Sequence, residues 1–109
     1  MNSIFPAGGL AAARALLDAC ATRRIRLATA ESCTGGLIAA CLTEFPGSSS
    51  VVDRGYVGYD NAAKQAMLGV DPAILAEHGA VSEATARAMV AGALTEAGVG
   101  LAVAVTGIA

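Results

Sequence analysis

The stretch IRLATAESCTGG occupies residues 25–36 and joins a predicted strand to a predicted helix. Residues 25–30 form the predicted strand, and the two glycines that end the stretch let another group approach the backbone closely. After these glycines, apolar residues recur at the spacing of one buried helix face, at Leu37, Ile38, Cys41, Leu42 and Phe45. The stretch therefore predicts a strand–turn–helix unit.

The rest of the chain continues this alternation of helices and strands. The other predicted elements, in chain order, are a helix over 9–22, a strand over 51–59, short helices starting at Asp60 or Asn61 and at Asp71, a longer helix capped by Ser82, and a strand over 101–105. This order predicts an α/β sandwich with a partly parallel sheet.

Composition narrows the functional class. Seven basic and nine acidic residues give a net charge of −2, so we expect no nucleic-acid partner. The apolar runs are far shorter than the roughly 20 residues that span a bilayer, and the N-terminus lacks the pattern of a secretory signal. We therefore expect a cytoplasmic protein that does not bind membranes.

Two further counts concern assembly and metals. Alanine supplies 26 of the 109 residues and aromatics only 4%, so the core buries little area per residue. A domain of this size has limited buried surface, so we expect a homo-oligomer. Three cysteines without a CxxC pair and a single histidine argue against a zinc site and a disulfide framework.

The turn between the first strand and its helix carries the candidate chemistry. Unbonded amides at the start of a helix, here around Thr34, Gly35 and Gly36, suit a phosphate, a carboxylate or a developing oxyanion. Ser32 and Cys33 are two potential nucleophiles beside them. On local chemistry alone, a purely structural interpretation is equally good, with Ser32 or Thr34 capping the helix and Cys33 packing as a small apolar residue.

Four segments of the sequence resemble one known family in their residues and in their order along the chain. They are ATAESCTGGLIAACLTEFPGSS at 28–49, GYVGYDNAAKQAMLGV at 55–70, HGAVSEATARAM at 78–89 and AVAVTGIA at 102–109. Together they are similar to the CinA C-terminal domain family, which includes the stand-alone nicotinamide-nucleotide amidases (PncC type). The resemblance implies a three-layer α/β/α sandwich with a mixed, partly parallel sheet. It also implies hydrolysis of the carboxamide of nicotinamide mononucleotide to the acid and ammonia, with no cofactor and no metal.

The same resemblance implies roles for particular residues. Ser32 corresponds to the family's nucleophile, Tyr59 and Lys64 to its Y-x-x-x-x-K motif, and Thr106 to the threonine of its VTG turn. A neutral lysine can take the proton of a serine, and a tyrosine can relay a proton or orient the lysine.

Two placements of the substrate stay open at this point. The amides from Thr34 to Gly36 either stabilise the oxyanion or hold the 5′-phosphate, which would leave Thr106 and Gly107 for the reacting carbonyl. Without the family, Lys64 would be interpreted as a solvated surface residue. Glu31 has two candidate roles, pairing with a basic neighbour or orienting the site.

Two other functions compete with the serine amidase. In one, Cys33 is the nucleophile and His78 its base. In the other, the chain is a non-catalytic nucleotide-binding module or a competence- or damage-related interaction module.

The family pattern continues beyond residues 105–109 with a glycine- and proline-rich loop and further strand and helix. We therefore expect residues 1–109 to be a single domain of this family that is incomplete at its C-terminal end, with the following parts closing the sheet.

Overall fold

The computed structural model describes residues 2–108, which form five α-helices, three strands and one short 3₁₀ helix. Their order and bounds are α1 (Ala7–Arg23), β1 (Leu27–Glu31), α2 (Leu37–Thr43), η1 (Ser48–Ser50), β2 (Val52–Val57), α3 (Asn61–Leu68), α4 (Pro72–His78), α5 (Glu83–Ala97) and β3 (Leu101–Val105). The predicted order of elements is confirmed.

The three strands form one sheet in the order β2-β1-β3, with both pairs parallel. Each connection between strands contains at least one helix, which carries the chain back to the edge where it began, as parallel pairing requires. The predicted α/β sandwich is confirmed. The antiparallel part of the expected mixed sheet is not among the strands of residues 2–108, where the sheet is wholly parallel.

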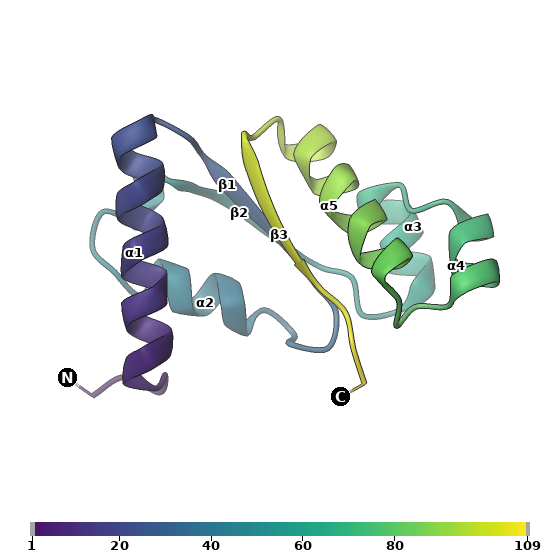
Figure 1. Cartoon of the computed structure of the whole chain (residues 1–109), viewed down its shortest axis with the longest axis horizontal. Coiled ribbons are helices and arrows are strands. Elements are labelled where there is room, and N and C mark those ends of the chain that lie inside the picture. Colours follow the sequence, from purple (N-terminus) through teal and green to yellow (C-terminus); the bar gives the residue numbers. More distant parts are fainter. Residues whose placement is uncertain (1, 109) are drawn as a thin grey trace.

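Helices cover both faces of the sheet (Figure 1). On one face, α1 and α2 pack against it through an apolar cluster that includes Leu17, Leu27 and Leu42. On the other face, α5 packs against β1 and β3, and α3 and α4 pack against α5, through a cluster that includes Ala30 and Met89. Alternate residues of the central strand therefore serve opposite layers, and all five residues of β1 are buried.

Local sequence explains where several helices begin and end. The Asp71 carboxylate accepts a hydrogen bond from Ala73 N (2.8 Å) at the start of α4, and the Ser82 hydroxyl accepts one from Thr85 N (3.1 Å) at the start of α5. Both predicted caps are confirmed. Asp60 precedes α3 as predicted, but its side chain makes no capping bond.

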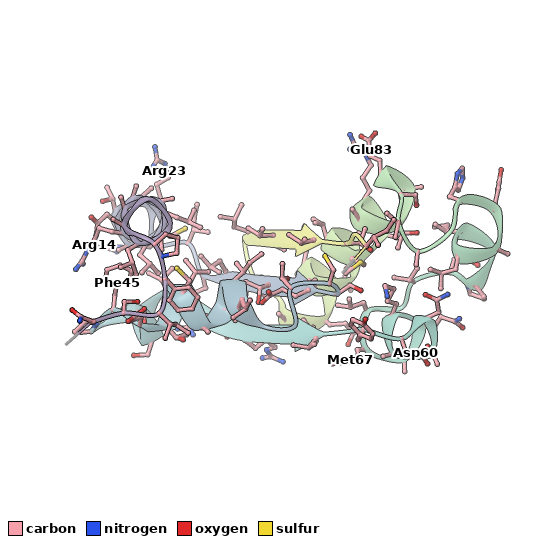
Figure 2. The ribbon with its side chains drawn as sticks, turned by 90° about the horizontal axis from the view of Figure 1, so that it is seen from below. Arg14, Arg23, Phe45, Asp60, Met67 and Glu83 are labelled. Carbon is pink, nitrogen blue, oxygen red and sulfur yellow. The ribbon has the colours of Figure 1, made fainter. Side chains whose placement is uncertain are left out.

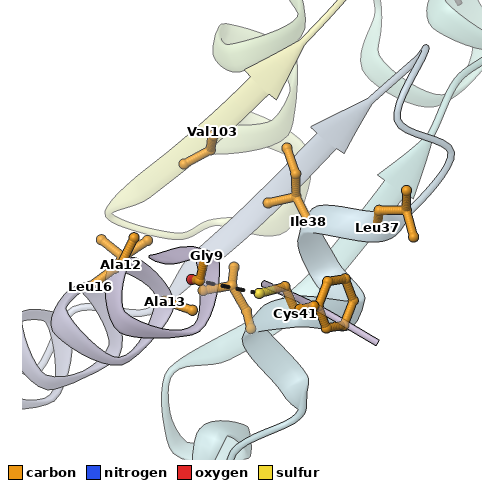
Figure 3. A pocket seen from close by; sticks show the side chains of 10 residues that line it. Gly9, Ala12, Ala13, Leu16, Leu37, Ile38, Cys41 and Val103 are labelled. Atoms are coloured by element: carbon orange, nitrogen blue, oxygen red, sulfur yellow. Dashed lines mark hydrogen bonds between the residues drawn. The ribbon is translucent and has the colours of Figure 1, made fainter. Parts of the chain in front are cut away.

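Phe45 lies just outside α2, which ends at Thr43, and it still packs against the core on the α1 side. The guanidinium of Arg14 stacks over the Phe45 ring at 4.6 Å from its centroid (Figure 2). Further along these helices, an apolar groove of about 390 Å³ lies between α1, α2 and Val103 of β3 (Figure 3).

Candidate active site

The carboxyl ends of the three strands bring the predicted site residues to one edge of the sheet. Ser32 follows β1, and its amide donates to Val105 O at the end of β3 (2.9 Å). On the other side, Gly58 N, just past β2, donates to Glu31 O (2.9 Å). Because these bonds continue the parallel ladder, Ser32 is held between the ends of both neighbouring strands. In open α/β sheets this edge is where ligands bind.

Ser32 begins a tight turn that leads into α2. Its side chain is buried, and its carbonyl accepts a hydrogen bond from Gly35 N (3.1 Å). Gly35 and Gly36 have φ values of +59° and +102°, a region that other residues rarely adopt. The two glycines therefore let the chain reverse within four residues after the strand.

Glu31 fills the start of α2 with its own carboxylate. This side chain is fully buried and accepts hydrogen bonds from Ile38 N (2.9 Å), Ala39 N (3.0 Å) and the Thr34 hydroxyl (2.6 Å). Of the two roles considered from the sequence, pairing with a basic neighbour is wrong, because no cation lies within ion-pair distance of Glu31 among residues 2–108.

This arrangement changes the interpretation of the predicted anion site. The amides of Gly35 and Leu37 are bonded within the turn, and the Thr34 hydroxyl and the amides of Ile38 and Ala39 donate to the Glu31 carboxylate. In the part of the chain that the structure describes, the amides of Thr34 and Gly36 have no protein acceptor. Sequence reasoning missed the capping role of Glu31 because its partners lie up to eight residues ahead, beyond the spacing of a capping box.

Lys64 is buried rather than solvated. On α3 this residue is 1% exposed, and its Nζ donates a hydrogen bond to the backbone carbonyl of Tyr59 (2.8 Å). The surface interpretation is therefore wrong. The side chain of Tyr59 is 66% exposed, so it is the main chain of Tyr59 that holds the lysine.

Gly58 contacts both Lys64 and the end of β1, next to Ser32. Its amide is bonded to the residue before Ser32, and a Cβ added at Gly58 would lie 3.6 Å from the Cα and the Cγ of Lys64. Lys64 therefore packs directly beside Gly58, at the point where the chain leaves β2. The structure therefore brings the predicted nucleophile and the predicted base to the same edge.

The VTG turn reaches this edge from β3. The Thr106 hydroxyl donates to Ala80 O (2.7 Å), which ties the turn to the loop between α4 and α5. A Cβ at Gly107 would lie 3.2 Å from the Cys33 sulfur, so Gly107 lies against the turn that carries Ser32. Thr106 and Gly107 are therefore at the site, but the hydroxyl of Thr106 already has an acceptor.

The competing Cys33–His78 pair is not assembled in residues 2–108. His78 is at the end of α4, where its Nε2 lies 3.8 Å from the carboxylate of Glu77, and no hydrogen bond joins it to Cys33. The cysteine alternative therefore lacks the histidine base that it requires.

Charged groups pair at the opposite edge of the sheet. Asp53, beside the start of β1, contacts Arg26 (3.5 Å) and Arg54. Its hydrogen bond and negative charge raise the pKa of Arg54 above the ordinary value.

Residues 2–108 contain no group of three or more His, Cys, Asp or Glu side chains placed to hold a metal ion. No helix in the same range is long and apolar enough to cross a membrane.

Comparison with known proteins identifies the family of this chain. The family model of the CinA C-terminal domain matches residues 10–109. A CinA-like protein from Mycobacterium marinum is 62% identical over 84 residues, and one from Mycobacterium tuberculosis is 60% identical over the same length. Each match covers 77% of this chain and 20% of the relative. The chain belongs to the CinA C-terminal domain family.

Solved structures agree with this assignment. The competence/damage inducible protein CihA from Agrobacterium tumefaciens has a TM-score of 0.95 at 50% identity, covering 98% of this chain and 65% of that chain. A CinA superfamily protein from Escherichia coli has a TM-score of 0.89 at 30% identity, covering 98% of this chain and 67% of that chain. This chain thus spans about a fifth of the curated relatives and about two thirds of the solved ones.

Proposed function

We propose that the chain is an amidohydrolase that converts nicotinamide mononucleotide to nicotinate mononucleotide and ammonia, a step of pyridine-nucleotide salvage. Ser32 acts as the nucleophile and Lys64 as its base. The observation that carries the proposal is the burial of both residues at the edge of the sheet where ligands bind, with Ser32 directly after β1 and Lys64 packed against Gly58, whose amide bonds to Glu31 O.

The reaction proceeds through an acyl-enzyme. The Ser32 oxygen attacks the carboxamide carbon while the unprotonated amine of Lys64 accepts the hydroxyl proton. The tetrahedral intermediate collapses, the C–N bond breaks, and ammonia leaves with the proton that the lysine returns. Water then hydrolyses the ester, which releases the carboxylic acid and regenerates the serine. These steps need no cofactor.

The surroundings of Lys64 support its role as the base. No carboxylate lies within ion-pair distance of its nitrogen in residues 2–108, and its hydrogen-bond partner is a neutral carbonyl. Lys64 is also the only lysine in the sequence. A buried lysine without a counter-ion is unusual in a structural role, because an unpaired charge is costly to bury.

The turn favours one of the two substrate placements. The carboxylate of Glu31 already occupies the start of α2, so a phosphate at this position would face a buried negative charge. The unbonded amides of Thr34 and Gly36 instead lie within a few residues of the nucleophile. We therefore assign them to the oxyanion, where one donor is typically worth about 2.7 to 4 kcal/mol in the transition state.

The test is ammonia release from nicotinamide mononucleotide by the purified chain. We expect release by wild type, none by Ser32→Ala and none by Lys64→Ala. Ser49→Ala is the matched control, because Ser49 is exposed and lies in η1, outside the site. Equal rates for wild type and Ser32→Ala would contradict the serine mechanism, and release by neither would contradict the proposed activity of this chain.

A further inference from the structure

Glu31 is the most extensively bonded side chain at the carboxyl edge of the sheet. Its carboxylate is fully buried and accepts three hydrogen bonds, from the Thr34 hydroxyl and from the amides of Ile38 and Ala39. All three partners are donors, which matches a carboxylate, because that group only accepts. One side chain thus binds the middle of the turn and the first residues of α2.

The main chain of Glu31 fixes the other end of the same turn. Its carbonyl accepts from Gly58 N (2.9 Å), and the next amide, that of Ser32, donates to Val105 O (2.9 Å). The turn is therefore attached to the sheet before Ser32 and to the Glu31 carboxylate after it. The four residues 33–36 lie between these attachments and directly follow Ser32.

We propose that Glu31 is a positioning residue, whose carboxylate holds turn 33–36 in the conformation that presents the Ser32 hydroxyl for reaction. The proposal rests on the proposed function. Glu31 touches neither substrate nor base, and it acts through Thr34 and α2.

The contacts predict what substitution does. In Glu31→Gln one carboxylate oxygen is replaced by an NH₂ group, which faces a hydrogen-bond donor of the turn or of α2. At least one of the three hydrogen bonds is therefore lost, and the turn shifts. A small misplacement of reacting groups can cost about 100-fold in rate. We expect kcat to fall by between about tenfold and 100-fold, with KM within about twofold of wild type, because the binding groups are unchanged.

Two variants of Thr34 test the hydrogen bond between the Thr34 hydroxyl and the Glu31 carboxylate. Thr34→Val removes the hydroxyl bonded to Glu31 and should lower kcat in the same direction, whereas Thr34→Ser keeps the hydroxyl and should restore most of the rate. Glu83→Gln is the matched control. Glu83 is exposed at the start of α5 and pairs with Arg87, away from the turn (Figure 2).

Covalent labelling of Ser32 by a small fluorophosphonate, measured by intact mass, tests the proposal without turnover. A P–O bond forms to the serine oxygen, the P–F bond breaks, fluoride leaves, and the hydroxyl proton passes to a base. We expect Glu31→Gln to slow labelling at least about tenfold while Glu83→Gln labels at the wild-type rate.

The outcomes separate this proposal from the proposed function. If wild type labels at Ser32 but releases no ammonia, and Glu31→Gln labels slowly, the amidase assignment fails and the positioning role stands. If folded Glu31→Gln labels and turns over within twofold of wild type, or if wild type does not label at Ser32, the positioning role is overturned. If Glu31→Gln does not fold, Thr34→Val and Thr34→Ser decide, and equal labelling by both overturns it.

Discussion

Gly92 marks the point where α5 comes closest to α3. A Cβ added at this glycine would overlap the carbonyl oxygen of Leu68 and lie 2.8 Å from its carbonyl carbon. Leu68 is the last residue of α3, and the next amide, that of Gly69, is already bonded to Gln65 O (3.0 Å). The obstacle is therefore backbone that is fixed on its other side, and no rotation of a side chain relieves the clash.

The expected loss in the free energy of unfolding follows from this geometry. Carbon and carbonyl oxygen normally approach to about 3.3 Å or more, so Gly92→Ala must move the two backbones apart by more than about 1 Å. Overpacking of this kind costs roughly 1 to 3 kcal/mol, and we expect about 3 kcal/mol because backbone must move. With roughly 4 to 8 °C per kcal/mol for a domain near 100 residues, the melting temperature should fall by more than about 10 °C.

Urea denaturation followed by circular dichroism measures this free energy of unfolding. Gly8→Ala is the matched control, because no atom of the described residues lies within 4 Å of a Cβ at this position in the first turn of α1. It should leave stability unchanged or raise it by up to about 1 kcal/mol through helix propensity. A Gly92→Ala protein with the wild-type midpoint would refute the reasoning from close packing.

Substitutions at three other positions test the packing of the sheet and one helix cap. Gly55→Ala should destabilise by about 1 to 3 kcal/mol, because its Cβ would lie 2.7 Å from the Thr29 hydroxyl and 3.1 Å from the Ala39 Cβ; an unchanged urea midpoint would contradict this. Thr29→Val should stabilise by about 1 kcal/mol in the same assay, since it removes a buried hydroxyl that has no hydrogen-bond partner within residues 2–108; a loss of stability would show that this hydroxyl is satisfied. Asp71→Ala should cost about 0.5 to 2 kcal/mol in thermal unfolding through loss of the cap to Ala73 N, and Asp71→Asn should recover most of it.

Local patterns in the sequence predict the elements of this fold well. Residues 101–105 are a strand in both prediction and structure, and Ser82 and Asp71 cap the helices that they were expected to cap. These features depend on neighbours within a few residues. Boundaries were less accurate: the predicted strand over 51–59 ends at Val57, because the chain turns at Gly58 toward α3.

The candidate site depends on contacts that local patterns do not contain. Lys64 sits in a polar stretch, and it is buried because α3 packs against α5 and against the chain at Gly58. Glu31 ends a strand, and its role appears only when α2 folds back over the sheet. The expected homo-oligomer, the cytoplasmic location and the incomplete domain stay predictions.

The burial of the central strand β1 affects how long the backbone at the candidate nucleophile stays in place. Its five residues are buried and paired on both sides, so its amides are among those that exchange with water only when the whole domain unfolds. Ser32 comes directly after this strand. The backbone that carries Ser32 therefore stays in place for as long as the domain is folded, and a change far from the site alters activity mainly through the fraction of molecules that are folded.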